Sequence, residues 1–176
     1  KTPIKERKFI LMFQDYELFP HMNIFDNVGF GLKMEGKDKS FIEKEVDKYL
    51  NLVDLIDHKN KYPAQLSGGE KQRIALARSL IVKPKMLLLD EPFTALDPTL
   101  RENLRRETFK IIKEQDIPTI FVTHDINEAV EVADKLAILS NGKFVAYDSP
   151  RNIFDNPGNL STASFIFEDN IIGNKL

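Results

Sequence analysis

The apolar residues of this chain follow two patterns, and the first consists of short runs bounded by proline or charged residues. Such runs are typical of strands buried on both faces of a parallel sheet. They lie at residues 8–13, 86–89 and 118–122. Two more runs, 136–140 and 143–148, are separated by Asn141-Gly142, a dipeptide that favours a tight hairpin turn. We therefore expect three strands, of which those at residues 86–89 and 118–122 are buried, and one hairpin.

The second pattern places apolar residues three or four positions apart, which is the spacing of one face of a helix. The predicted helices span residues 40–53, 67–81 and 99–115. Their expected inward faces are Phe41, Val46, Tyr49, Leu50 and Val53; then Ile74, Ala75, Ala77, Leu80 and Ile81; then Leu100, Leu104, Phe109, Ile111 and Ile112. Asp125 and Ser149 precede two shorter helix starts. Strands that alternate with helices in this way predict an α/β fold with a parallel sheet.

Composition and charge exclude several classes of function. A chain of 176 residues has the length of one domain and enough residues to bury a core. The net charge of −2 gives no indication of a positively charged surface that would bind a nucleic acid. The absence of cysteine excludes disulfides and thiol chemistry. No apolar run approaches the roughly 18 residues of a membrane-spanning helix, and the N-terminus is unlike a signal peptide. We therefore expect any membrane association to go through a partner.

The start of the predicted helix at residues 67–81 combines a capping box with two glycines. Ser67 and Glu70 have the S-x-x-E spacing in which each side chain accepts a hydrogen bond from the other residue's backbone. Gly68 and Gly69 leave bare backbone at the positive end of the helix dipole, where N–H groups can face an anion. An ordinary capped helix without a ligand is the alternative at this point.

Two adjacent acids, Asp90 and Glu91, end the apolar run at residues 86–89. Ligands of open α/β sheets bind at the carboxyl ends of the strands, where carboxylates need a compensating cation or proton. This arrangement suits Asp90 to orient Mg²⁺ and Glu91 to polarise a water. A solvated pair of loop acids is the alternative, and the uninterrupted apolar run before the pair disfavours it.

Two further side chains follow predicted strands. Gln14 comes after the first strand, and a strand-end amide can reach a metal or a water, although a lone glutamine is more often a surface residue. His124 follows the strand at residues 118–122, where an imidazole can contact a terminal phosphate, although a lone histidine is usually structural. A dense apolar and aromatic stretch follows soon after Gln14, and it contains Tyr16, Leu18, Phe19, Met22 and Phe25. We expect these residues either to pack locally or to form a docking groove for a partner helix.

The joint spacing of these motifs resembles the ATPase subunit of ATP-binding cassette (ABC) proteins. LSGGEKQR at residues 66–73 resembles the family signature, MLLLDE at 86–91 its Walker B strand, and Ala95-Leu96-Asp97 its D-loop. The resemblance implies a P-loop NTPase-like (RecA-like) parallel sheet with an inserted helical subdomain. The implied parts are residues 1–19 for the first core strand and Q-loop, 20–82 for the helical subdomain, 83–150 for the rest of the α/β core, and 151–176 for a C-terminal helix and extension.

The resemblance also implies roles for individual residues, with ATP and Mg²⁺ as cofactors. Glu91 would be the general base, Asp90 and Gln14 would hold Mg²⁺, and His124 and Gln14 would order the γ-phosphate and the attacking water. The nucleotide held by a second subunit, in a head-to-tail homodimer, would be contacted by Ser67, Gly68, Gly69, Gln72 and Asp97. Transmembrane permease subunits would be the other partners, which places the protein at the cytoplasmic face of the cell membrane.

The phosphate-binding Walker A loop of that family has only one near-match here, at residues 31–38. We reject this near-match, because Asp38 replaces the hydroxyl residue of the G-x-x-x-x-G-K-[ST] pattern. The segment directly before the near-match, NVGFGL, is also not a buried strand. We therefore expect an N-terminally incomplete cassette of an ABC importer. The chain resembles the polyamine, maltose, sulfate and molybdate importer ATPases most, with a polyamine as the first choice of solute. The alternatives are a catalytically incompetent fragment or interaction module, and a soluble ABC ATPase outside transport, although the interval from Gln14 to Ser67 is too short for the long coiled coil of DNA-repair members.

Overall fold

The computed structural model describes residues 3–12, 16–94, 98–159, 162–163 and 166. Gln14 and the Ala95-Leu96-Asp97 segment therefore lie outside the described residues. The chain divides into two compact units, Lys1–Val122 and Thr123–Leu176. Among the residues that the structure describes, none of the helices is long and apolar enough to cross a membrane.

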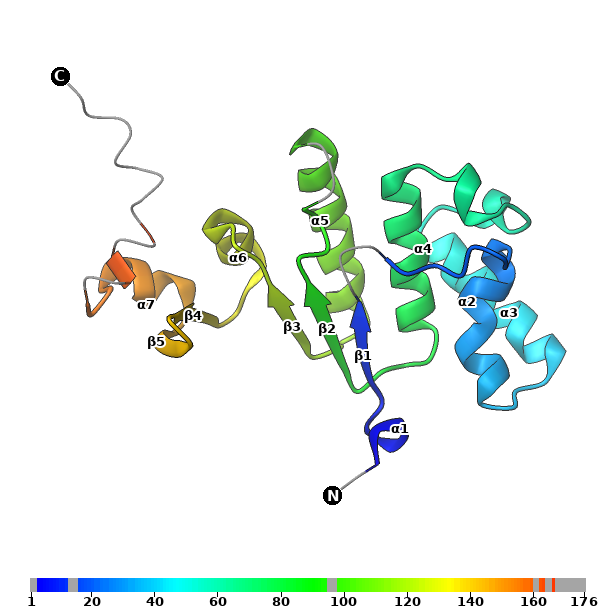
Figure 1. Ribbon diagram of the computed structural model, residues 1–176, viewed down its shortest axis with the longest axis horizontal. Coiled ribbons are helices and arrows are strands. Elements are labelled where there is room, and N and C mark those ends of the chain that lie inside the picture. Colours follow the sequence, from blue (N-terminus) through cyan, green and yellow to red (C-terminus); the bar gives the residue numbers. More distant parts are fainter. Residues whose placement is uncertain (1–2, 13–15, 95–97, 160–161, 164–165, 167–176) are drawn as a thin grey trace. The chain divides into compact units, whose positions relative to one another are not determined.

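A three-stranded parallel sheet forms the centre of the first unit (Figure 1). Its strands are β1 (Phe9–Met12), β2 (Met86–Asp90) and β3 (Thr119–Val122), in the order β1-β2-β3. Because the strands are parallel and in register, their carboxyl ends meet at one edge of the sheet, where Asp90 pairs with Val122. The three strands predicted from the sequence are confirmed, and this edge carries the two acids.

Three of the longer helices in the first unit begin at polar caps. The short α1 (Ile4–Arg7) precedes β1, and the larger helices are α2 (Ile24–Met34), α3 (Lys39–Leu52), α4 (Gly68–Leu80) and α5 (Pro98–Glu114). Asn23, Asp38 and Ser67 cap α2, α3 and α4 by accepting backbone N–H bonds. Two short 3-10 turns, η1 (Ile56–His58) and η2 (Pro63–Gln65), lead from α3 into α4. Helix α4 packs against α2, α3, β1 and α5, so it joins the helical part of this unit to the sheet (Figure 1).

The sheet face that carries Leu87 and Leu89 is buried against the helices, and both side chains are at most 1% exposed. The prediction that β2 and β3 are buried on both faces is wrong within the described residues. Side chains alternate between faces along a strand, and the opposite face is only partly covered. On that face Ile120 is 49% exposed and Val122 is 50% exposed.

The predicted helix faces are largely confirmed where the side chains are described, which excludes Leu100, with one exception in α3. Ile42 rather than Phe41 occupies the first buried position, because Phe41 lies one residue off the apolar stripe and is 38% exposed. The ring of Phe41 instead lies 5.9 Å from Lys37 Nζ. The rejected phosphate-loop pattern runs across the end of α2 into the cap of α3, so a helix and not a strand leads directly into it.

The second unit contains α6 (Ile126–Val132), the antiparallel pair β4 (Leu136–Ser140) and β5 (Lys143–Asp148), and α7 (Pro150–Asp155). The predicted hairpin is confirmed. Asn141 and Gly142 have φ angles of 49° and 73°, which is the left-handed conformation that a two-residue hairpin turn requires. A core with Ile126, Leu136, Ile138 and Ile153 holds the unit together.

Candidate functional site

The acid pair stands where the sequence predicts it, at the carboxyl end of β2. Asp90 is the last residue of the strand and is exposed, and Glu91 follows it in a left-handed conformation with φ of 45°. The Glu91 N–H donates to the Val122 carbonyl at 2.9 Å, which ties the turn to β3. The Thr94 hydroxyl donates to Glu91 Oε2 at 3.2 Å. One oxygen of the Glu91 carboxylate is therefore oriented by a neighbour within the same turn.

The donor set at this edge is compatible with Mg²⁺. No group of three or more His, Cys, Asp or Glu side chains able to hold a metal occurs among the described residues. Mg²⁺ does not require such a group, because it is usually held by one or two carboxylates together with phosphate oxygens and water. The exposed Asp90 supplies one such carboxylate. The contribution predicted for Gln14 stays a prediction, since Gln14 lies outside the described residues.

The capping box at the start of α4 is confirmed. Glu70 N–H donates to Ser67 Oγ at 3.3 Å, and Ser67 N–H donates to Glu70 Oε2 at 2.7 Å. Ser67 and Gly68 are exposed, whereas Gly69 is buried. The exposed part of this turn can meet a phosphate group brought by another molecule, as the helix dipole favours.

A histidine that the sequence analysis missed also contacts this turn. His58 Nε2 lies 2.9 Å from Glu70 Oε1. The pKa of the Glu70 carboxyl is lowered, first by the Ser67 hydroxyl, then by the Ser67 backbone N–H and by His58. His58 comes from η1, and no regular spacing in the sequence connects it to the start of α4.

Gln72 differs from the exposed residues at the start of the same helix. Its side chain is 1% exposed, and within the described residues neither its amide nitrogen nor its amide oxygen has a hydrogen-bond partner. A nucleotide arriving at the surface of this chain would not meet it in this arrangement. The predicted contact between Gln72 and a nucleotide therefore finds no support here.

His124 lies in the second unit, in a turn whose neighbouring residues are well held. The Thr123 hydroxyl donates to Glu128 Oε2 at 2.8 Å and accepts from the Asp125 N–H at 3.1 Å. Asp125 Oδ1 in turn accepts from the Asn127 N–H at 2.8 Å, as the predicted cap of α6. These bonds fix the backbone on both sides of His124, whose side chain is exposed.

The segment that follows β1 is fixed by one buried side chain of α2. Asn27 is 0% exposed, and its Oδ1 accepts from the Phe19 N–H at 2.8 Å. Its Nδ2 donates to the carbonyls of Phe19, Met22 and Asn23 at 3.0–3.1 Å. Of the five residues expected either to pack locally or to form a docking groove, Tyr16 is buried and packs in the local core. Leu18, Phe19, Met22 and Phe25 are partly exposed.

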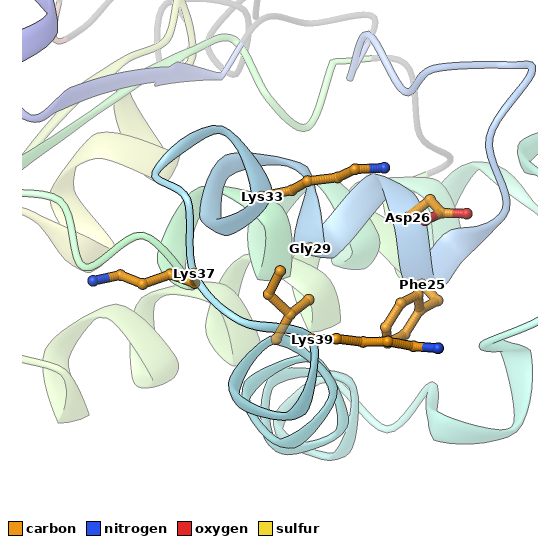
Figure 2. Close-up of a pocket in the computed structure, with 7 residues that line it drawn as sticks. Phe25, Asp26, Gly29, Lys33, Lys37 and Lys39 are labelled. Atoms are coloured by element: carbon orange, nitrogen blue, oxygen red, sulfur yellow. The ribbon is translucent and has the colours of Figure 1, made fainter.

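A pocket of about 360 Å³ opens between α2 and α3, and Phe25 is part of its wall. Its apolar surface comes from Phe25, Gly29 and Ile42, while Asp26 and three lysines complete it. Figure 2 shows the lysines, Lys33, Lys37 and Lys39, projecting outward around this surface. Two of these lysines, Lys33 and Lys37, belong to the rejected phosphate-loop pattern. Their place in a pocket is not visible in a local pattern, because it depends on the packing of α3 beside α2.

Comparison with known proteins gives a consistent result. The profile of the ABC transporter family matches residues 1–94, more than half of the chain. Spermidine/putrescine import ATP-binding protein PotA of Spiroplasma citri is 44% identical over 176 residues, which is 100% of this chain and 50% of that protein. PotA of Fusobacterium nucleatum is 44% identical over 174 residues, or 99% of this chain and 46% of that protein. Sulfate/thiosulfate import ATP-binding protein CysA of Pectobacterium atrosepticum is 45% identical over 171 residues, which is 95% of this chain and 52% of that protein.

The chain spans about half the length of these curated relatives. The profile match covers the residues that carry β1, the capped turn of α4, and the acid pair at the end of β2. The parallel sheet with its helices agrees with the P-loop NTPase fold of that family. This chain therefore belongs to the ABC transporter family.

Proposed function

We propose that this chain belongs to the ATP-hydrolysing subunit of an ABC importer, with Glu91 as the general base. The observation that supports this role best is the hydrogen bond from Thr94 to Glu91 Oε2, at the carboxyl end of β2 and next to Asp90. This bond orients the Glu91 carboxylate, which would accept a proton from an attacking water. Asp90 is the residue that would hold Mg²⁺, together with Gln14.

The second half of the site would come from a second copy of the protein. The exposed turn at Ser67 and Gly68, together with Gly69 and Asp97, is proposed to contact ATP held by the other subunit of a head-to-tail homodimer, and the buried Gln72 is left out of this proposal. Mg²⁺-bound ATP would supply the phosphoryl group to be transferred. His124 is proposed to contact the γ-phosphate of ATP. The hydrogen bonds of Thr123 and Asp125 support a fixed backbone on both sides of His124.

The pocket between α2 and α3 supports permease subunits as the further partners. Its floor of Phe25, Gly29 and Ile42 suits an apolar side chain, and its lysines suit carboxylates beside that side chain. We propose that a cytoplasmic loop of the permease with such residues docks here, next to the partly exposed residues that follow β1. The protein would thereby sit peripherally at the cytoplasmic face of the membrane.

As the solute we propose a polyamine. The relatives named above include spermidine/putrescine and sulfate/thiosulfate import proteins at similar identity. An uptake assay with both solutes is therefore needed to distinguish them. Deletion of the gene should remove uptake of labelled spermidine and leave uptake of labelled sulfate unchanged. The opposite result would refute the polyamine assignment and leave the ATPase proposal intact.

The test of the ATPase proposal is Glu91→Gln in the whole protein. Loss of the base should abolish turnover while ATP stays bound, because the amide keeps the shape of the carboxylate and cannot accept the proton. Glu102→Gln on the exposed face of α5 is the matched control and should hydrolyse ATP at the wild-type rate. Unchanged hydrolysis by Glu91→Gln would exclude Glu91 as the base, and a wild-type protein without turnover would refute the proposed activity.

A further inference from the structure

The backbone just after the first sheet strand is held in an unfavourable conformation by distant residues. Tyr16 and Glu17 have φ angles of 59° and 40°, in the left-handed region that residues with a side chain rarely adopt. Two such residues in succession persist only where the surrounding structure holds them. Tyr16 follows Gln14 by two positions in the sequence, so this conformation directly continues the segment of the predicted Q-loop.

Arg78 supplies the first of these contacts, from the last turns of α4. Its Nη1 donates to the Glu17 carbonyl at 2.8 Å and its Nη2 donates to the Tyr16 carbonyl at 2.9 Å. The guanidinium also lies 5.2 Å from the centre of the Phe19 ring. Partial burial lowers the pKa of Arg78, so burying this cation costs energy that the two charge-assisted bonds offset. A single planar group thus fixes both left-handed residues.

Tyr16 supplies the second contact, toward the acid pair. Its ring is buried, and its hydroxyl donates to the Pro92 carbonyl at 3.2 Å. Pro92 directly follows Glu91, which is itself left-handed with φ of 45°. One of the two residues that Arg78 holds, Tyr16, is therefore bonded to the turn that presents Glu91.

We propose that Arg78 and Tyr16 are positioning residues that couple the signature helix α4 to the turn of Glu91. This inference rests on the proposed ATPase function of Glu91. Arg78 lies 11 positions after Ser67 in the sequence, about 16 Å along the helix axis at 1.5 Å per residue. A shift of α4 caused by a contact at its exposed start would move the carbonyls of Tyr16 and Glu17, and through the Tyr16 hydroxyl it would move Pro92 and the base beside it.

The kinetic test uses Arg78→Lys and Tyr16→Phe in the whole protein. A lysine ammonium cannot span two carbonyls as the planar guanidinium does, and phenylalanine removes only the hydroxyl. Both variants should lower kcat for ATP hydrolysis about tenfold, because small displacements of a catalytic group cost this much or more. KM for ATP should stay within about twofold, since neither residue is proposed to contact ATP. The double variant should lose less than the product of the single losses, because both act through one segment.

Matched controls are Arg106→Lys, an exposed arginine of α5, and Tyr49→Phe, a buried tyrosine of α3. Both should keep the wild-type kcat. Wild-type kcat in both Arg78→Lys and Tyr16→Phe would overturn the proposal. The proposal would also be overturned if the loss of kcat in the double variant equalled the product of the two single losses. A loss of kcat that matches the loss of folded protein in thermal melts would overturn it as well.

A second readout does not depend on activity and separates this proposal from the proposed function. Amide hydrogen exchange of peptides covering residues 91–94 should be about threefold faster in Arg78→Lys than in wild type, because the link to Pro92 is loosened. A purely local role of Arg78 would change exchange at residues 16–19 and leave 91–94 unchanged, and this result would overturn the coupling. If the wild type lacks turnover and the exchange still changes at 91–94, the proposed function fails and the coupling stands.

Discussion

The hydroxyl of Thr94 donates a hydrogen bond to Oε2 of Glu91 across 3.2 Å, within the turn that follows β2. The backbone closes the same turn, because the Thr94 N–H points to the Glu91 carbonyl at 3.4 Å. Thr94 thus orients the carboxylate of Glu91, which we propose as the base. A substitution of Thr94 can remove this hydrogen bond and leave the carboxylate itself unchanged.

Thr94→Val should lower kcat for ATP hydrolysis by about tenfold, with KM for ATP nearly unchanged. Valine keeps the shape of threonine and removes the donor, and the loss of one positioned hydrogen bond to a charged group is worth about 1.5–3 kcal/mol. Steady-state kinetics of the whole protein check this. Thr94→Ser restores the hydroxyl and should keep most of the activity; equal activity in the valine and wild-type proteins would show that Thr94 does not orient the base.

Glu70→Ala should destabilise the protein at neutral pH by about 1 kcal/mol, the usual contribution of a helix cap. The folded protein holds the pKa of Glu70 below its ordinary value of 4.5, mainly through the bonds with Ser67. A lowered pKa in the folded state gives stability that is present above the ordinary value and is lost as the pH falls through the lowered one. The difference in free energy of unfolding between wild type and Glu70→Ala should therefore shrink below about pH 4.

Denaturant unfolding at pH 7 and at pH 3.5 measures that difference directly. Glu114→Ala, at the exposed end of α5, is a control that removes a carboxylate without removing a cap. A difference for Glu70→Ala that is as large at pH 3.5 as at pH 7 would contradict the assigned role of the ionised carboxylate.

The elements predicted from the sequence are those with local causes. The capping box of Ser67 and Glu70 is determined by residues three positions apart, and the hairpin at Asn141-Gly142 by two neighbouring residues. The position of the acid pair follows from the end of a short apolar run. Each of these features has its whole physical cause within a few residues, so a local pattern is sufficient.

The features that the sequence analysis missed depend on residues far apart in the chain. The partners of Arg78 lie 61 and 62 positions away, and those of the Tyr16 hydroxyl lie 76 positions away. The burial of β2 was predicted wrongly because a run of apolar residues does not show how many layers cover a sheet. Phe41 and Ile42 are adjacent apolar residues, and Ile42 rather than Phe41 continues the helical spacing of Val46 and Tyr49, so the sequence could have distinguished them.

Asn27→Ala should be among the most destabilising polar substitutions in the first unit, at about 2–3 kcal/mol. The side chain is 0% exposed and satisfies the Phe19 N–H together with three carbonyls, and a buried polar group left unpaired costs about 1–3 kcal/mol. Asn51→Ala is the control, because Asn51 is exposed and makes a single bond to the Asp47 carbonyl. Chemical denaturation of both variants checks the prediction, and similar losses at the two positions would contradict it.

Gly31→Ala should destabilise the contact between α2 and the end of α4 by about 1–3 kcal/mol, the usual cost of overpacking a helix contact. Alanine is otherwise the better helix former by about 1 kcal/mol, so a loss of stability must come from crowding. A Cβ at position 31 would overlap Cγ1 of Val82, which follows α4. Valine is stiff at χ1 and cannot easily turn this methyl away.

The double variant Gly31→Ala with Val82→Ala tests this cause, because it removes the crowding methyl and should recover most of the stability lost by Gly31→Ala. The two substitutions should therefore couple strongly in a double-mutant cycle of unfolding free energies. Additive losses would mean that the methyl of Val82 is not what requires glycine at position 31, and that another neighbour of α2 sets the requirement.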